Sequence, residues 1–300
     1  MVTTAFKLPE QWYTWPPTWF PSPPTLENFY ITWMGYQMIA RPGIVLPTIS
    51  LDPLLALGNS VVIAGSATLL SVIIGLLLAY GVSRYQILPE KRMFNLLVLR
   101  MMPPIVIAIP LVIWYSTLKF LDTWHGMIII YTITTIPYAA WMTKSFIDEV
   151  PEEMEQAAQL LGASKLRAFF TIVVPLIRSG IVATCMFILI LTWSEYLLAL
   201  VMTAADAQTM PVQLSKFEGA SEGRLYGFQS AMSIGVTIPL IVIGNDALAL
   251  STGLLLIDIN IDLIGALALS TGLPHLLLQF RGLDRVSRHL RKGSMSRRRQ

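Results

Sequence analysis

The chain has 300 residues, of which 54% are apolar and only 13% are charged, and its mean hydropathy is +0.62. Soluble domains carry about 25% charged residues, so this composition excludes an ordinary soluble domain and predicts an integral membrane protein. The formal net charge of +3 is set by the C-terminus, because eight of the 21 Lys and Arg residues lie between Arg281 and Arg299.

Residues 1–52 are rich in Trp and Pro and lack the continuous apolar core of a signal peptide. Few of them are basic, so we expect an extracytoplasmic N-terminal segment. We expect four of its tryptophans, Trp12, Trp15, Trp19 and Trp33, to rest at the membrane interface, where indole rings are favoured. An outside segment of this length normally follows an inbound span, so we favour loss of a preceding helix over unaided translocation of the amino end.

Five runs between residues 53 and 245 are long and apolar enough to span a membrane, because crossing a hydrocarbon core of about 30 Å takes roughly 20 residues. Gly and Pro recur inside these runs, and membrane helices tolerate both residues better than soluble helices do. The sequence therefore predicts an all-α fold, a polytopic transmembrane helix bundle that occupies residues 53–245. The runs are Pro53–Ser83, Met101–Leu118, Gly126–Thr143, Ser179–Ala205 and Leu225–Asn245.

Basic residues of short loops mark the cytoplasmic side of a membrane protein. They are concentrated after the first and the third predicted span, so both of these loops are predicted to lie inside. The loops Lys119–His125 and Asp206–Arg224 mix acidic and basic residues and are predicted to lie outside. The inner basic residues are Arg84, Lys91 and Arg92 after the first span, and Lys144, Lys165, Arg167 and Arg178 after the third.

The chain beyond residue 245 divides into an atypical apolar segment, 246–280, and a basic tail, 281–300. The sequence ALALSTGL occurs twice, at Ala247–Leu254 and Ala266–Leu273, a step too short for a solenoid repeat. We interpret it as a local duplication or an altered reading frame. A sixth span within Leu263–Phe280 is the alternative, but it would carry the tail outside, against the positive-inside bias. We prefer a re-entrant or interfacial segment and a cytoplasmic tail, and we expect this tail to meet anionic lipid or no partner rather than nucleic acid.

The longest predicted cytoplasmic loop apart from the tail is residues 147–178. Its first half is predicted to form a helix that begins at Pro151, carries acidic residues in its first turn and ends at Gly162, which can adopt a left-handed cap conformation. A second helix is predicted from Ser164, and Pro175 then bends the chain into the next span. The result is a rigid knob at the membrane face.

Two interpretations of this knob stay open on the residues alone. The small side chains of Ala157 and Ala158 allow the backbone of a partner protein to approach closely, and flanking charges would fix its orientation. The alternative is an amphipathic helix that lies on lipid headgroups.

The spacing of the knob resembles that of a known family. The knob reproduces the spacing of the EAA loop of binding-protein-dependent ABC-importer permeases. The pattern is Gln156-Ala157-Ala158, three residues, Gly162, nine residues, Ile172, two residues and Pro175. Further segments resemble the carbohydrate branch of that family, the maltose, trehalose and glycerol-phosphate type. They are PPTWFPSPPTLENF, GNSVVIAGSATLLSVIIGLLLAYGVSRY and TWSEYLLALVMT. The whole resemblance covers about residues 10 to 243. The family usually has Glu where Gln156 stands, although Glu155 adjoins it, and often has Asp where Leu161 stands.

The resemblance implies a type I ABC importer permease fold from which the first helix of the family is missing. It implies a multi-pass transmembrane subunit of the bacterial cytoplasmic (inner) membrane that translocates a sugar or related polyhydroxylated solute. The implied partners are a second permease subunit, two ATPase subunits, an extracytoplasmic solute-binding protein and membrane lipid, with no nucleic acid. The implied ATPase-docking residues are Glu155, Gln156, Ala157, Ala158, Gly162, Ala163, Ile172 and Pro175.

The sequence carries no pattern that predicts catalysis or a bound cofactor. Its His residues are widely separated, no metal-ligand spacing such as HExxH occurs, and no glycine-rich loop precedes a Lys and Ser/Thr pair that would hold a nucleotide. Cys185 is the single cysteine and is interpreted as a small buried hydrophobe. We therefore expect ATP and Mg²⁺ to bind a partner ATPase rather than this chain. The alternative to a permease is a membrane-embedded scaffold or enzyme whose loop binds lipid or an unrelated protein.

Three residues are candidates for a translocation path. Glu195 is an acid within an apolar run, which is by default a functional hypothesis; the alternative is an interfacial carboxylate with a structural partner. Pro104 and Pro137 lie in predicted spans, where a broken helix frees carbonyl groups to line a pathway, although proline kinks are also common in ordinary packing.

Overall fold

A computed structural model of the chain describes residues 1–34, 52–100, 104–218, 225–245 and 247. Every regular element among these residues is a helix, so the all-α prediction is confirmed. The chain divides into two compact units, Met1–Gly244 and Asn245–Gln300. The predicted apolar segment 246–280, apart from Ala247, and the predicted tail 281–300 lie outside the described residues.

Among the described residues, three helices are long and apolar enough to cross a membrane: α3 (Pro53–Tyr85), α6 (Trp124–Asp148) and the helix Tyr226–Asn245. A fourth crossing exists if the helices Lys165–Leu176 and Arg178–Trp193 form one span, which is bent by 76°. Arg178–Trp193 is α10. The prediction of five spans is therefore approximate, since three of the predicted runs are single long helices and two are not.

The second predicted span, Met101–Leu118, is represented by a shorter helix, α5 (Pro104–Thr117), which follows α4 (Glu90–Arg100). α5 has 14 residues, and at about 1.5 Å per residue it is too short to cross a hydrocarbon core of about 30 Å alone. Proline is favoured at the first position of a helix and cannot continue a preceding one, which explains the start at Pro104. α4 contacts α6, and α5 contacts α11 (Leu197–Met202).

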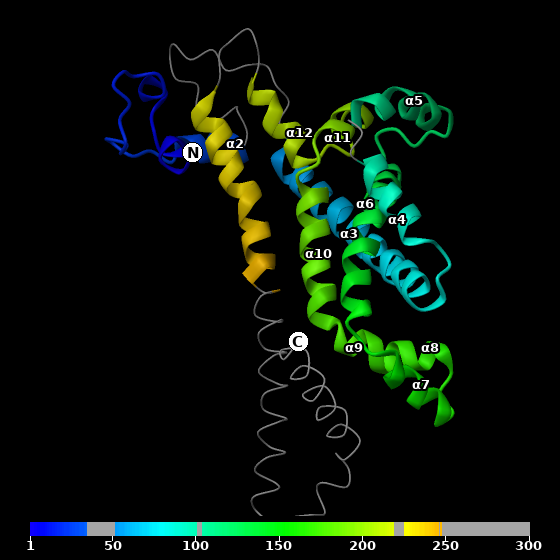
Figure 1. Ribbon diagram of the computed structural model, residues 1–300. Coiled ribbons are helices and arrows are strands. Elements are labelled where there is room, and N and C mark those ends of the chain that lie inside the picture. Colours follow the sequence, from blue (N-terminus) through cyan, green and yellow to red (C-terminus); the bar gives the residue numbers. More distant parts are fainter. Residues whose placement is uncertain (35–51, 101–103, 219–224, 246, 248–300) are drawn as a thin grey trace, which may run out of the picture. The chain divides into compact units, whose positions relative to one another are not determined.

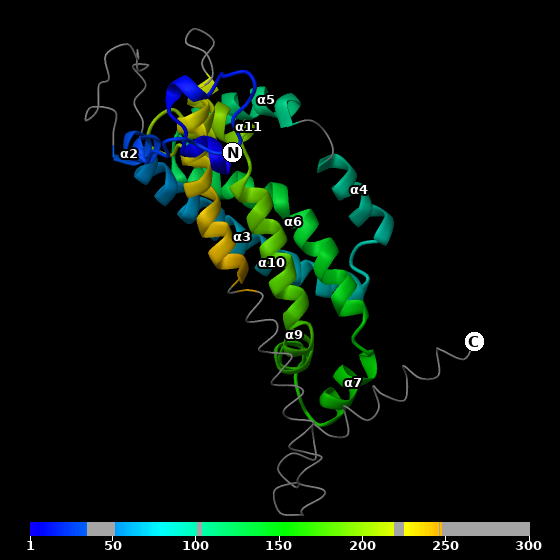
Figure 2. The ribbon, with the colours of Figure 1, turned by 90° about the vertical axis from the view of Figure 1, so that its left-hand side faces the viewer.

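The core of the bundle consists of α3, α6 and α10, which pack against one another in pairs (Figures 1 and 2). α3 and α6 approach closely at Gly75, where an added Cβ would lie 2.6 Å from the Cβ of Ala139. One turn away, the hydroxyl oxygens of Ser71 and Thr135 form a buried hydrogen bond of 2.6 Å. Small residues and interhelical hydrogen bonds join helices in lipid, because lipid tails are as apolar as the side chains and give no hydrophobic drive.

Hydrogen bonds at one end of the bundle join three segments that are far apart in the sequence. Asn59, near the start of α3, donates to the carbonyl oxygens of Asp206 at 2.8 Å and Gln208 at 2.9 Å. Its side-chain oxygen accepts the indole N–H of Trp124, the first residue of α6, at 2.9 Å. Following the basic residues, we name this the outer end and the opposite one, where α3 and α6 terminate, the cytoplasmic end. The alternation of loops agrees with the order predicted from the charges.

The remaining described helices are short. The N-terminal segment contains α1 (Val2–Ala5), the 3₁₀ turn η1 (Pro9–Gln11) and α2 (Glu27–Met34). The cytoplasmic end carries α7 (Glu152–Leu160), α8 (Lys165–Ala168), the π-helical turn η3 (Phe169–Val173) and α9 (Val174–Leu176). The outer end carries α12 (Met210–Ser215) and the 3₁₀ turn η4 (Lys216–Glu218).

Two of the four tryptophans expected at the membrane interface pack within the protein. The rings of Trp12 and Phe228 meet edge-on with 5.2 Å between their centroids, and Trp33 packs against the same apolar cluster at the outer end. Trp15 and Trp19 are 90% and 81% exposed. Among these four, only Trp15 and Trp19 thus keep the exposure that an interfacial position requires.

Asp122 joins the loop between α5 and α6 to the segment that follows α11. Its backbone is left-handed, with a φ of 54°, a conformation that Asp tolerates better than most residues. The carboxylate accepts the backbone N–H groups of Ala205, Asp206 and Ala207 at 2.9, 3.1 and 3.0 Å. Burial would raise the pKa of this carboxyl, but the N–H donors outweigh burial, so the pKa of Asp122 lies below its ordinary value.

Replacing Asp122 with Asn is expected to destabilise the outer end, because a neutral amide loses charge-assisted hydrogen bonds worth about 1–3 kcal/mol. The measurement is the apparent melting temperature of the purified protein in detergent. The pKa of Asp122 is lower in the folded state than in the unfolded state. The carboxylate therefore stabilises the folded protein above about pH 4, and this stabilisation is lost as the pH falls through the folded pKa. Wild type and variant should therefore converge in acid.

Asp206→Asn is the matched control. It removes the same charge from the same loop, but the side chain of Asp206 is exposed and it is the backbone N–H that bonds to Asp122. Equal loss of stability in the two variants at neutral pH would contradict the role given to the Asp122 carboxylate.

Candidate functional site

The cytoplasmic knob, defined here as residues 152–176, begins with α7. Its first turn is acidic, which the positive end of the helix dipole favours. α7 ends at a left-handed glycine: Gly162 has a φ of +92°, and the N–H of Ala163 donates to the carbonyl oxygen of Ala158 at 3.0 Å. The predicted glycine cap is therefore confirmed. Pro151 precedes α7 as its N-cap residue, so the helix starts one position later than predicted.

The chain leaves this corner through a second helix that starts where the sequence predicts it. The Ser164 hydroxyl accepts the N–H of Arg167 at 3.3 Å and caps α8. α8 continues into the π-helical turn η3, and the chain bends by 76° between Leu176 and Arg178. Pro175, which cannot donate a backbone hydrogen bond, lies within two residues of this bend.

The corner exposes apolar side chains at the cytoplasmic end. Leu160 and Leu161 are 89% and 90% exposed, and Gln156, Ala157 and Gly162 beside them are exposed as well. We name these five residues the exposed tip. Single exposed leucines are common on protein surfaces, but two adjacent and almost fully exposed ones on a rigid corner indicate an apolar contact surface.

The other predicted docking residues occupy different positions. Ala158 and Ala163 are half-buried and form the hydrogen-bonded corner, Ile172 is half-buried in η3, and Pro175 is exposed in α9. Glu155 is only 4% exposed and points into the chain. The structure therefore brings three of the predicted residues, Gln156, Ala157 and Gly162, together at the tip, and it places the Glu155 carboxylate behind it.

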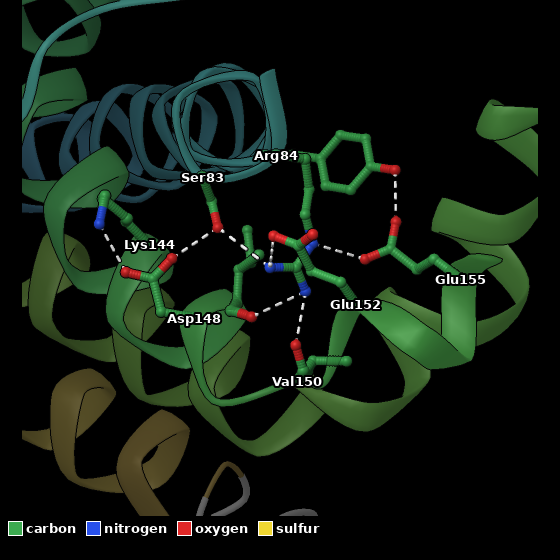
Figure 3. Close-up of polar contacts among 9 residues, drawn as sticks. Ser83, Arg84, Lys144, Asp148, Val150, Glu152 and Glu155 are labelled. Carbon is green, nitrogen blue, oxygen red and sulfur yellow. Dashed lines mark hydrogen bonds and ion pairs between the residues drawn. The ribbon is translucent and has the colours of Figure 1, made fainter. Parts of the chain in front are cut away.

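Glu155 is held by the last two turns of α3 (Figure 3). Its Oε1 accepts the Nε–H of Arg84 at 2.6 Å, and its Oε2 accepts the hydroxyl of Tyr80 at 2.6 Å. The side chains of Arg84 and Glu155 are 9% and 6% exposed, so salt and water screen this ion pair weakly. The carboxylate thus acts within the chain and is not part of the exposed tip.

The guanidinium of Arg84 also binds the C-terminal end of α6. Its Nη2 donates to the carbonyl oxygens of Val150 at 2.7 Å and Ile147 at 3.2 Å, and its Nη1 donates to the Ser83 hydroxyl at 3.3 Å. Glu152 lies 3.8 Å from Nη1 as a second acidic partner. All three guanidinium nitrogens therefore have acceptors. Lysine, with a single ammonium nitrogen and no planar fork, cannot reproduce this arrangement.

Asp148 extends the network along α6. Its Oδ1 accepts the Ser83 hydroxyl and its Oδ2 pairs with Nζ of Lys144, both at 2.5 Å (Figure 3). The Asp148 side chain is 42% exposed, so this pair contributes less than the buried pair of Arg84 and Glu155.

Aromatic contacts join the same turns of α3 to α8 and η3. The Phe169 ring is fully buried, and its centroid lies 4.4 Å from that of Tyr80. Nζ of Lys165 lies 4.8 Å from the centroid of the Tyr85 ring, within the range of a cation–π interaction. We name Tyr80, Arg84 and Tyr85 the α3 anchor. From the sequence, Arg84 served only to predict that its loop lies on the cytoplasmic side. The four-residue spacing of Tyr80 and Arg84, which puts both on one helix face, could have indicated the anchor.

The three candidates for a translocation path lie on separate elements. Glu195 stands in the break between α10 and α11, where its Oε1 accepts the N–H of Leu198 at 3.2 Å and its carbonyl oxygen accepts the hydroxyl of Tyr131 at 3.4 Å. These contacts match the alternative of a carboxylate with a structural partner. Pro104 begins α5, and Pro137 is half-buried inside α6. A role of these three residues in the path stays a prediction.

No cluster of His, Cys, Asp or Glu within the described ranges is arranged to hold a metal ion. Cys185 is half-buried in α10.

This helix bundle and its cytoplasmic knob define a class of protein, the permeases of ABC transporters. Residues 71–251 match the family described as "Binding-protein-dependent transport system inner membrane component". The match covers more than half of the chain, and the chain belongs to this family of permease subunits, which are multi-pass proteins of the inner membrane and not enzymes.

Individual proteins that resemble this chain are also transport permeases. The trehalose transport system permease protein SugB of Mycobacterium tuberculosis is 35% identical over 191 residues, which are 62% of this chain and 69% of that protein. The trehalose/maltose transport system permease protein MalG of Thermococcus litoralis is 29% identical over 220 residues, 73% and 74% of the two chains. The resemblance to the carbohydrate-importer permeases is thus confirmed.

A solved structure shows the same fold. The crystal structure of a bacterial ABC transporter involved in the import of the acidic polysaccharide alginate matches with a TM-score of 0.61, over 81% of this chain and 86% of that chain, at 14% identity. The predicted ABC importer permease fold is therefore confirmed.

Gly162→Ala is expected to strain the corner and loosen the knob. An added Cβ would meet nothing within 4 Å, so the cost comes from the backbone alone and is about 1–2 kcal/mol for a left-handed L-residue. The measurement is hydrogen exchange of the peptide 157–165, which should become about tenfold faster, since about 1.4 kcal/mol corresponds to a factor of ten.

Gly65→Ala is the control for this substitution. Gly65 also has open space around its Cβ position, but it lies in the regular helix α3, where Ala is the better residue. Unchanged exchange at the knob in Gly162→Ala, or an equal acceleration in Gly65→Ala, would contradict the assignment of Gly162 as a conformational requirement.

Proposed function

We propose that this permease subunit imports a sugar or a related polyhydroxylated solute, and that an ATPase subunit docks on the exposed tip. The observation that carries the docking proposal is the almost complete exposure of Leu160 and Leu161 on a rigid corner, at the end that the basic residues mark as cytoplasmic. The names of the relatives, trehalose and maltose transport permeases, support the solute class.

The proposed assembly contains this chain, a second permease subunit, two ATPase subunits, an extracytoplasmic solute-binding protein and the surrounding lipid. ATP and Mg²⁺ bind the ATPase subunits. Binding of ATP closes the two ATPase subunits and displaces the docked tip, so that the bundle opens outward; hydrolysis resets it. Such a cycle needs a ligand that binds one state of the protein more tightly than the other, and ATP is that ligand here.

Apolar burial is the main attraction in the proposed docking. Gln156 and Leu161 are uncharged, in contrast to the acidic residues that the family usually has at these positions. Burying one leucine side chain contributes about 1.5–3 kcal/mol, and Leu160 and Leu161 both present their side chains. Ala157 beside them leaves room for the partner backbone.

The acidic first turn of α7 argues against this helix lying on lipid headgroups, whereas the exposed basic residues of the knob, Lys165 and Arg167, lie in α8. Helices that lie on membranes carry Lys and Arg on their polar face, whereas α7 reads EEMEQAAQL and has no basic residue. The anionic surface of a cytoplasmic leaflet would repel these carboxylates. This charge favours a protein partner.

Leu160→Asp is expected to release the ATPase subunit. The substitution places a charge where an apolar side chain is buried on docking, and the loss of about 1.5–3 kcal/mol reduces the affinity tenfold or more. Co-purification of the ATPase subunit with a tagged form of this chain measures the effect.

Leu26→Asp is the matched control, because Leu26 is 54% exposed in the N-terminal segment at the outer end. It should leave co-purification unchanged. Equal recovery of the ATPase subunit with wild type and Leu160→Asp would contradict the docking proposal.

The solute class is tested by the ATPase activity of the reconstituted transporter with its binding protein. Sugars, polyols and glycerol phosphates are compared with amino acids at equal concentration. We expect at least one polyhydroxylated compound to stimulate hydrolysis and transport, with no stimulation by amino acids. Stimulation by amino acids alone would refute the proposed substrate class and leave the docking proposal in place.

A further inference from the structure

The knob joins the spanning helices through its two covalent ends and through side-chain contacts with α3. At its start the knob follows α6 through residues 149–151, and at its end it continues into α10, but the π-helical turn η3 and the 76° bend lie between the tip and α10. Both features interrupt the regular hydrogen-bond ladder of an α-helix. The covalent connection to α10 is therefore the compliant one, and at the connection to α6 Arg84 binds the carbonyl oxygens of Ile147 and Val150.

The knob contacts α3 at three places, and the contacts made by Glu155 and Phe169 are buried. The α3 anchor contacts α7 through Glu155, η3 through Phe169 and α8 through Lys165. Three successive elements of the knob thus attach to the last two turns of one spanning helix. The pair of Arg84 and Glu155 cannot separate without leaving a buried charge unpaired, so the knob and the end of α3 move together.

α3 is suited to carry a displacement across the membrane. It runs for 33 residues with proline only at its first position, whereas α5 and α6 contain Pro110 and Pro137 in their interiors. Near its other end, Asn59 binds the outer loop at the carbonyl oxygen of Asp206. At about 1.5 Å per residue, Arg84 and Asn59 are about 40 Å apart along the helix, more than the thickness of the hydrocarbon core.

We propose that Arg84 is a positioning residue that fixes the knob to α3, and that α3 relays the movement of the docked ATPase to the outer loop at Asp206. This inference rests on the proposed function of the exposed tip. Arg84 itself touches neither nucleotide nor solute in this scheme; it acts through Glu155.

The test uses the assembled transporter, with the second permease subunit and the ATPase subunits, reconstituted in lipid. Cys185, the single cysteine, is replaced by Ala, and Asp206→Cys supplies one thiol at an exposed position of the outer end. The rate of maleimide labelling is compared without nucleotide and with ATP, Mg²⁺ and vanadate. In this background the rate should change about fivefold or more, the lower range of coupling between distant sites.

Arg84→Met should uncouple the two ends without releasing the ATPase subunit, because the exposed tip is unchanged. The nucleotide-dependent change of the labelling rate should fall below about twofold, while co-purification of the ATPase subunit stays at the wild-type level. Glu155→Gln keeps the shape and an acceptor oxygen for Arg84 and should give a response between wild type and Arg84→Met.

Rescue and control variants separate positioning from folding. The double variant Arg84→Met, Glu155→Met leaves no unpaired buried charge and refills the site with apolar side chains, so it should recover part of the response. Lys91→Met removes a cation from an exposed position of α4 at the same end and should respond as wild type.

A wild-type response of Arg84→Met overturns the proposal, and so does an unresponsive thiol in the parent background. Loss of the ATPase subunit from Arg84→Met also overturns it, because Arg84 would then support the fold of the tip rather than position it. Failure of docking itself is seen separately, as retention of the ATPase subunit by Leu160→Asp, a variant in which Arg84 is intact.

Discussion

The buried pair of Arg84 and Glu155 is the interaction on which the cytoplasmic end depends. Two charges removed from water stabilise a structure only when every donor and acceptor around them is satisfied, and here this needs the ends of α3 and α6 and the first turn of α7 in place together. A shift of any one of these segments leaves a charge or a carbonyl group without its partner. The pair therefore sets the register of three segments at once.

Elsewhere the bundle is held by contacts that do not rely on apolar burial, because lipid offers the same apolar surroundings as a neighbouring helix. In the middle, Gly75 and the hydroxyls of Ser71 and Thr135 bring α3 and α6 together. At the outer end, Asn59 and Asp122 satisfy backbone groups of the loop after α11. Helix α3 thus takes part in polar contacts at both ends of the bundle and in the close packing of small residues between them.

Local signals made much of this fold predictable. Run length identified α3, α6 and the last described helix, and Gly162 and Ser164 marked the corner because caps depend on neighbouring residues. Hydropathy did not reveal the break after α10, because the flanking residues are mostly apolar and the break is held by polar contacts, such as the one in which the Glu195 carboxylate accepts the N–H of Leu198. The α3 anchor also escaped prediction: Arg84 and Glu155 are 71 positions apart, and their pairing is decided by how the helices pack.

The exposed tip has a consequence for the life of the subunit before assembly. A copy without its ATPase presents Leu160 and Leu161 to the cytoplasm, and exposed apolar side chains promote aggregation and attract the chaperones and proteases that triage incomplete proteins. On the proposed docking, the partner covers this signal when it binds. An unassembled subunit is therefore more exposed to aggregation and degradation than one whose two leucines the ATPase covers.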